Sequence, residues 1–147
     1  MSVTAKLAEL GLTIPTPGPR GKIAKAVRTG NLVFSSGNVS PEQGKIGSDL
    51  TLDQGYQAAR GAMINTLGNL LEVLGSLDEV TRVVKILGFV NCAEGFCDTP
   101  TVMHGATDLL NELFGEDVGY HARSAIGVYQ LPVNSAVEIE IIVEVAG

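Results

Sequence analysis

The stretch that decides the fold is Ala136-Val-Glu-Ile-Glu-Ile-Ile-Val-Glu-Val145. Apolar residues occupy every second position, and this period is typical of a β-strand with one face in the core. That face consists of Val137, Ile139, Ile141, Val143 and Val145. The other face mixes carboxylates with one apolar residue: Glu138, Glu140, Ile142 and Glu144. The pattern predicts a sheet covered on one side, whose second face meets water or another subunit.

Four further segments have strand patterns. Residues 24–28 and 32–36 flank a turn with a glycine and predict a hairpin. Residues 80–90 are rich in valine, isoleucine and phenylalanine. Residues 123–131 precede a turn at 132–135, so they predict a C-terminal hairpin with the strand at 136–145.

Two segments have helical periodicity. Residues 52–74 predict a helix that begins near Thr51 or Asp53 and has Gly75 at its C-terminus. Residues from 98 or 99 to Gly115 predict a second helix. Three glycines inside the first helix predict close packing against the sheet: Gly55, Gly61 and Gly68. The resulting order, β-β-α-β-α-β-β, predicts an α+β fold with two helices on one face of a mixed sheet.

The N-terminal region differs from the rest of the chain. Residues 2–10 predict a short amphipathic helix that ends at Gly11. Three prolines at positions 15, 17 and 19 exclude regular structure in the next segment. We therefore expect an N-terminal helical arm and proline connector at 1–19, followed by one domain at 20–147.

Length and composition bound the class of protein. The chain has 147 residues, 45% hydrophobic and 18% charged, with a net charge of −6. Its mean hydropathy of +0.25 is high for a small monomer and suggests that an oligomer covers apolar surface. No stretch reaches the roughly 20 apolar residues of a membrane span, and no uncharged signal segment is found, so we expect a cytoplasmic protein.

The charge distribution disfavours nucleic acid as a partner. Residues 1–30 have a net charge of +4, which leaves −10 on the remainder. The basic segment contains no aromatic residue on which a base could stack. An acidic body repels a phosphate backbone, so nucleic-acid binding is not expected.

Arg123 is the strongest candidate for a binding residue. It is the only cation after Lys85 and lies in a small, apolar strand segment. A guanidinium at such a place needs an anion, and its planar fork fits a carboxylate. The sequence alone leaves two interpretations of Arg123 equally open: it binds the carboxylate of a ligand, or it forms an ion pair at the edge of the sheet.

Two other positions could complete a site. In the predicted C-terminal hairpin, Glu138 lies about 20 Å along the strand from the position opposite Arg123, so a shared site would need a second subunit. Ser36 could offer its hydroxyl and backbone N–H to a small anion, or could simply end a strand.

Metal and cofactor sites are not expected. Cys92, Cys97, His104 and His121 match no compact zinc spacing, and both cysteines are expected as free thiols. No serine-hydrolase elbow, phosphate loop or dinucleotide glycine motif is found.

Three segments in this order and spacing resemble the Rid/YjgF family, also called the endoribonuclease L-PSP family: residues 30–38, 122–128 and 131–140. Within this RidA-like family, the resemblance is to the longer branch with an N-terminal helix rather than to RidA itself. It implies the bacillus-type chorismate-mutase-like fold, in which three subunits form a central barrel with a cleft between each pair.

The resemblance also implies roles for individual residues. Arg123 would bind the carboxylate of a 2-imino acid, and Glu138 would position the water that hydrolyses the C=N bond. Ser36 and Gly37 would line the same cleft. Three positions depart from the RidA pattern and change the pocket, namely Ile23, His104 and Ala125; of these, His104 and Ala125 are expected to contact substrate.

Three functions follow as hypotheses. The first is a homotrimeric imine or enamine deaminase acting on a small carboxylate. The second is a ligand-binding or regulatory trimer without turnover, which the departures from the RidA pattern favour. The third, an endoribonuclease, follows from the family's other name, and the acidic body argues against it.

Overall fold

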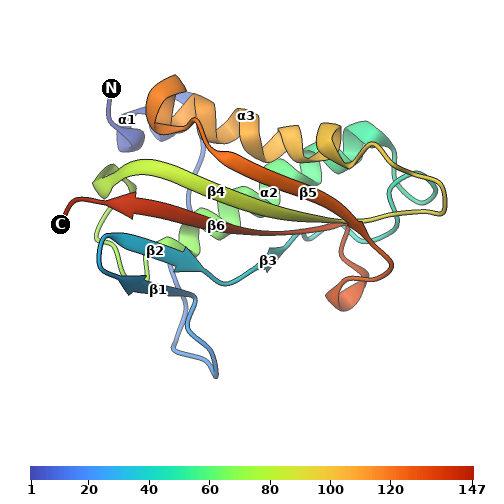
Figure 1. Ribbon diagram of the computed structural model, residues 1–147, viewed down its shortest axis with the longest axis horizontal. Helices are drawn as coiled ribbons and strands as arrows, with labels where there is room; N and C mark the ends of the chain where they lie inside the picture. Colours follow the sequence, from blue (N-terminus) through green and yellow to red (C-terminus); the bar gives the residue numbers. More distant parts are fainter.

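Figure 1 shows the computed structural model, which describes residues 1–147. One mixed sheet has the order β1-β2-β6-β4-β5, and β3 pairs with β6 next to β2. The strands are β1 (Ala26–Thr29), β2 (Leu32–Ser35), β3 (Asn38–Val39), β4 (Val80–Asn91), β5 (Ala122–Val128) and β6 (Val137–Val145). The helices are α1 (Val3–Leu10), α2 (Leu52–Leu70) and α3 (Thr99–Val118), with short 3₁₀ turns η1 (Leu77–Glu79) and η2 (Pro132–Asn134). The predicted α+β class, with α2 and α3 on one face, is confirmed.

The alternating segment forms β6, in the middle of the sheet. It pairs with β2 and β3 along one edge and with β4 along the other. Its apolar face is at most 2% exposed and packs beneath the two long helices. The predicted inward face of this strand is therefore confirmed.

The predicted C-terminal hairpin is wrong. Strand β5 does not pair with β6; it pairs in parallel with β4, which lies between them. Because β4, α3 and β5 form a β-α-β unit, β5 returns beside β4 in the same direction. The chain then crosses to the other side of β4 through residues 129–136, where η2 contains left-handed Val133 and Asn134.

Helix α2 begins where the sequence indicated and ends earlier. The Thr51 side chain accepts a hydrogen bond from Gln54 N, and Gln54 caps Thr51 N in return. The helix ends at Leu70, followed by i→i−3 hydrogen bonds that tighten the chain, so Gly75 is not its C-terminal cap. Gly115, with a φ of 81°, interrupts the helix at its predicted end, and a separate last turn then follows to Val118.

The three predicted packing glycines differ from one another. A Cβ on Gly55 would lie 2.7 Å from the Ile46 side chain, and one on Gly68 would lie 2.6 Å from the Pro15 carbonyl oxygen. Both glycines thus permit close contacts, although with a loop and the connector rather than the sheet. Gly61 faces open space, so its predicted packing role is wrong.

Helix α1 packs on the domain through Asp78. The Asp78 carboxylate accepts hydrogen bonds from the N–H groups of Val3 and Thr4 and from the Thr4 hydroxyl, at 2.6, 3.3 and 2.6 Å. These bonds, the Thr4 hydroxyl first, lower the pKa of Asp78. Val3 itself is 7% exposed and belongs to the core. The arm is therefore fixed at its N-terminal turn.

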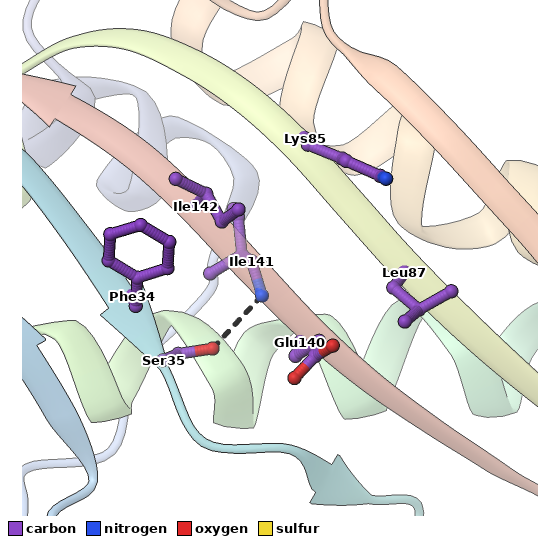
Figure 2. Close-up of a pocket in the computed structure, with 7 residues that line it drawn as sticks. All are labelled: Phe34, Ser35, Lys85, Leu87, Glu140, Ile141 and Ile142. Atoms are coloured by element: carbon purple, nitrogen blue, oxygen red, sulfur yellow. Dashed lines mark hydrogen bonds between the residues drawn. The ribbon is translucent and has the colours of Figure 1, made fainter.

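The second face of the sheet carries no helix. Apolar side chains on it are well exposed, with Val27 at 54%, Phe34 at 39% and Ile126 at 45%. A small hollow of about 130 Å³ lies on this face, and its lining includes Phe34, Lys85 and Glu140 from three neighbouring strands (Figure 2). We call this side of the sheet the open face. None of the helices combines the length and apolarity needed to cross a membrane.

Candidate functional site

Arg123 lies at the edge of the sheet, on the side covered by helices. In strand β5 it is the partner of Ile86, which is fully buried beneath α3. Cross-strand partners point to the same face, so the Arg123 side chain is directed toward α3. Strand β5 is at the end of the sheet order, the location that the ion-pair interpretation of Arg123 assumed.

A hydrogen-bond network from α3 and the segment before β5 holds Arg123. Its Nη1 donates to His104 Nδ1 at 2.9 Å and to Thr107 Oγ1 at 3.2 Å. The Thr107 hydroxyl is also 3.1 Å from His121 Nε2, and His121 Nδ1 is 2.5 Å from the Gly119 carbonyl oxygen. Because a guanidinium only donates and a carbonyl only accepts, both tautomers follow. His104 carries its proton on Nε2, and His121 carries its proton on Nδ1.

Burial lowers the pKa of two residues in this network, His121 and Arg123. The pKa of His121 is lowered, first by burial and further by the Arg123 charge, although the bond to Gly119 opposes the shift. His121 is therefore neutral near pH 7 and can accept from Thr107. Burial also lowers the pKa of Arg123, but a guanidinium stays protonated at this pH.

Arg123 has no carboxylate partner within the chain. The two ion pairs of the structure are Lys6–Glu9 and Arg60–Glu112. Asp108 interacts with Arg123 only at longer range, and its carboxylate accepts a hydrogen bond from the Tyr56 hydroxyl at 2.6 Å. The ion pair at the sheet edge is therefore absent from the single chain, which leaves a ligand or a second subunit as the source of an anion.

A polar hollow of about 370 Å³ opens beside Arg123. Its lining contains no carboxylate and consists of His104, Thr107, Asn111, Tyr120, His121 and Arg123. Sequence reasoning missed Thr107, Asn111 and Tyr120. His104, Thr107 and Asn111 are three and four residues apart, so they lie on one helical face. This spacing could have identified Thr107 and Asn111 from the sequence.

Glu138 and Gly37 form a second pair. Glu138 on β6 is the partner of Phe89 and lies on the open face of the sheet. A Cβ on Gly37 would lie 2.6 Å from Glu138 Oε2, so only glycine lets the carboxylate occupy this position. Burial, followed by the charge of Glu140, raises the pKa of Glu138. Glu138 is thus a better base near neutral pH than an ordinary glutamate.

The structure separates the predicted site residues into two groups. Arg123 and His104 lie on the helix side of the sheet, whereas Glu138 and Gly37 lie on the open face. The two groups do not form one site within one chain. The sequence had suggested this separation, but from a hairpin that does not exist.

Ser36 does not offer free donors to an anion in this structure. Its hydroxyl donates to the Ala24 carbonyl oxygen at 2.6 Å, and its N–H donates to the Lys25 carbonyl oxygen at 2.8 Å. Its own carbonyl accepts from the Asn69 side-chain amide. These bonds tie the loop before β1 to the start of β3, so Ser36 positions Gly37.

Ala125 and Ile23 occupy different surroundings. Ala125 is the partner of Gly88 on the same face as Arg123 and packs on the core. The Thr99 hydroxyl donates to its carbonyl oxygen at 2.8 Å. Ile23 lies in the loop before β1 and is 74% exposed. An apolar side chain so exposed is available for contact with a second subunit or a ligand.

The potential metal ligands do not converge. No group of three or more histidine, cysteine, aspartate or glutamate residues could hold a metal ion. Cys92 and Cys97 are free thiols, and burial, followed by the nearby Cys97, raises the pKa of Cys92. Cys92 is thus less reactive at neutral pH than an ordinary thiol.

Comparisons with known proteins show which sequences and structures this chain is similar to. Residues 17–145 match the family model described as "YjgF/chorismate_mutase-like, putative endoribonuclease". Protein TCP17 of Trypanosoma cruzi is 38% identical over 97% of this chain and 93% of its own. A 2-iminobutanoate/2-iminopropanoate deaminase of Dermatophagoides farinae is 30% identical over 86% and 88%. The structure of Atu1372 from Agrobacterium tumefaciens, of unknown function, is 33% identical with a TM-score of 0.89, covering 98% and 92%.

Proposed function

The chain belongs to the YjgF/chorismate-mutase-like family, and from this premise we propose that it hydrolyses the C=N bond of a small 2-imino acid in clefts between the subunits of a homotrimer. Arg123 of one subunit binds the carboxylate, and Glu138 of its neighbour activates water. The observation that carries this proposal is the half-buried Arg123 guanidinium, which has no carboxylate partner in its own chain.

Assembly is part of the proposal because the two groups lie on opposite faces of one sheet. The open face carries exposed Val27, Phe34 and Ile126, which a second copy would remove from water. If the open face of one subunit meets the β5 edge of the next, Glu138 and Arg123 come to one cleft. The relative from Dermatophagoides supports imine hydrolysis as the chemistry.

The reaction balances with water as the only co-reactant. Glu138 accepts a proton from the water as its oxygen bonds to the imine carbon, and returns that proton to the imine nitrogen as the C=N π bond opens, which gives a carbinolamine. Glu138 then transfers the hydroxyl proton of the carbinolamine to the nitrogen as the C–N bond breaks. Ammonia leaves, the 2-oxo acid is the other product, and Glu138 is again a carboxylate. Arg123 keeps the carboxylate fixed throughout, which holds the imine carbon near the water. Release of ammonia from freshly generated 2-iminopropanoate is the direct assay.

Mixed assemblies test whether the site is shared. Arg123→Ala and Glu138→Ala are each expected to be inactive alone. When the two are co-expressed with different tags and the mixed trimers are purified through both tags, about one cleft in three keeps both residues intact. We therefore expect roughly a third of the wild-type ammonia release per cleft. Mixed assemblies that stay inactive would show that both residues act within one subunit.

The pH profile tests Glu138 as the base. Because its pKa is raised, kcat/KM should fall, as pH decreases, at a higher pH than an ordinary glutamate would give. Glu140→Gln removes one cause of the raised pKa, so this acid limb should move to lower pH. Glu144→Gln, an exposed change on the same strand, is the control and should leave the limb in place. Equal shifts in both variants would refute the assignment of Glu138 as the base.

A second candidate, ligand binding without turnover, is favoured by one observation. The Ser36 donors are bonded within the chain, so that residue adds little to the stabilisation of a reacting group. Under this alternative, a small carboxylate would raise the melting temperature without being consumed. Ammonia release that depends on Arg123 would exclude it.

A further inference from the structure

Three residues of the hollow beside Arg123 present donors with no acceptor in the chain. The bond from Arg123 to His104 Nδ1 leaves His104 Nε2–H as a free donor. The Asn111 amide and the Tyr120 hydroxyl line the same hollow and make no side-chain hydrogen bond within the chain. Tyr120 is 77% exposed. The hollow therefore offers more donors than one carboxylate held by Arg123 can use.

Two of these donors, His104 and Asn111, lie on one face of α3, and Tyr120 follows the end of the helix. Arg123 is bonded to His104 and Thr107, which fixes its guanidinium near the middle of the helix. Asn111 lies four residues beyond Thr107, about 6 Å along the helix axis. A second group on a ligand could therefore bind one turn away from the carboxylate at Arg123.

The charges around the hollow permit an acceptor there. No carboxylate belongs to its lining. Glu116 and Asp117 line a separate hollow, together with Arg82 and with Tyr120, which belongs to both hollows. An oxygen-bearing ligand group at Asn111 would thus contact hydrogen-bond donors and no carboxylate in the lining of this hollow.

We infer that the ligand carries, beyond the carboxylate bound by Arg123, a second oxygen-bearing group that accepts hydrogen bonds from Asn111 and Tyr120. This group is a carboxylate or a carboxamide at the far end of a chain of about five carbons. His104 Nε2–H, beside the guanidinium, contacts the part of the ligand nearer the first carboxylate. The inference rests on the proposed function in one respect, namely that Arg123 is the carboxylate anchor.

Three five-carbon 2-oxo acids serve as stable probes of the corresponding imines. They are 2-oxoglutarate, 2-oxoglutaramate and 2-oxopentanoate, which end in a carboxylate, a carboxamide and a methyl group. Binding to the assembled wild-type protein is measured by calorimetry. We expect the first two to bind at least tenfold more tightly than 2-oxopentanoate, since the latter leaves the donors at Asn111 and Tyr120 unpaired.

Variants assign the difference to the hollow. Asn111→Ala should weaken 2-oxoglutarate to the level of 2-oxopentanoate and leave 2-oxopentanoate within about twofold, which also shows that the variant is folded. Asn111→Asp should reject 2-oxoglutarate while still binding 2-oxoglutaramate, whose amide can donate to the new carboxylate. Tyr120→Phe should reduce the difference in part.

The outcomes separate the two proposals. Equal affinities of the three acids for the wild-type protein would contradict the recognition of a second oxygen-bearing group, but not the binding of the first carboxylate by Arg123. An unchanged preference in Asn111→Ala would also contradict that recognition. If none of the three acids binds, or if Arg123→Ala binds them as well as the wild type does, the carboxylate anchor of the proposed function fails, and the inference fails with it.

Discussion

Replacing Arg123 with alanine is expected to lower kcat/KM for 2-iminopropanoate by about 100- to 1,000-fold, equivalent to about 3–4 kcal/mol. The guanidinium is half-buried and has no carboxylate partner within the chain, and in the proposed mechanism the substrate carboxylate is its anionic partner. Removing it leaves that carboxylate partly desolvated and unpaired, which costs more than an exposed charge pair would. Orientation of the imine carbon is lost as well, so kcat should fall together with affinity.

Two variants sharpen this test. Arg123→Lys keeps the charge but cannot reproduce the planar fork, so we expect an intermediate loss. Arg82→Ala removes another guanidinium from the sheet, at an exposed position on β4, and should leave kcat/KM unchanged. Sedimentation should show the same assembly for all of them. Wild-type ammonia release from Arg123→Ala would exclude the proposed mechanism.

The elements that were predicted correctly have strong local signals. The period-two pattern of 137–145 predicted β6 and its buried face, because a strand must bury one side chain in two. The capping residue Thr51 predicted the start of α2, since its side chain satisfies an orphan N–H within four residues. Such signals depend only on near neighbours in the sequence.

The pairing of β5 could not be predicted in the same way. Its residues have a strand pattern, but nothing local states which strand lies beside it. Proximity in sequence favoured β6, whereas the helix between β4 and β5 makes those two strands parallel neighbours. The connector at 129–136 is long enough for the chain to pass β4, and its length was the available signal against a tight hairpin.

The candidate site was predicted in part for the same reason. Arg123 was identified because a lone cation in an apolar strand needs a partner. Thr107 was not, because its role depends on which face of α3 contacts β5. Ser36 was assigned free donors that the loop before β1 uses internally. The sequence shows which side chains could bind a ligand or take part in catalysis. Tertiary packing decides which of their donors and charges remain unpaired within the chain.

The close approach of α2 and α3 depends on Gly105, which sequence reasoning did not single out. A Cβ at this position would lie 2.0 Å from the Tyr56 carbonyl oxygen and 3.1 Å from Arg60 N. Both atoms belong to the backbone of α2, so no side-chain rotation relieves the clash. The helices can accept a larger residue only by moving apart, and this opens the core beneath them.

We therefore expect Gly105→Ala to destabilise the protein by about 3 kcal/mol, which lowers the melting temperature by about 6–12 °C for a chain of this length. Gly61→Ala is the matched control, since it adds the same methyl group in α2 but meets no atom within 4 Å. It should stabilise the helix by up to about 1 kcal/mol through its higher helix propensity. Calorimetric melting at one protein concentration compares the two, because assembly shifts the transition. If Gly105→Ala melts at or above the wild-type temperature, the helices are not held at this distance by Gly105.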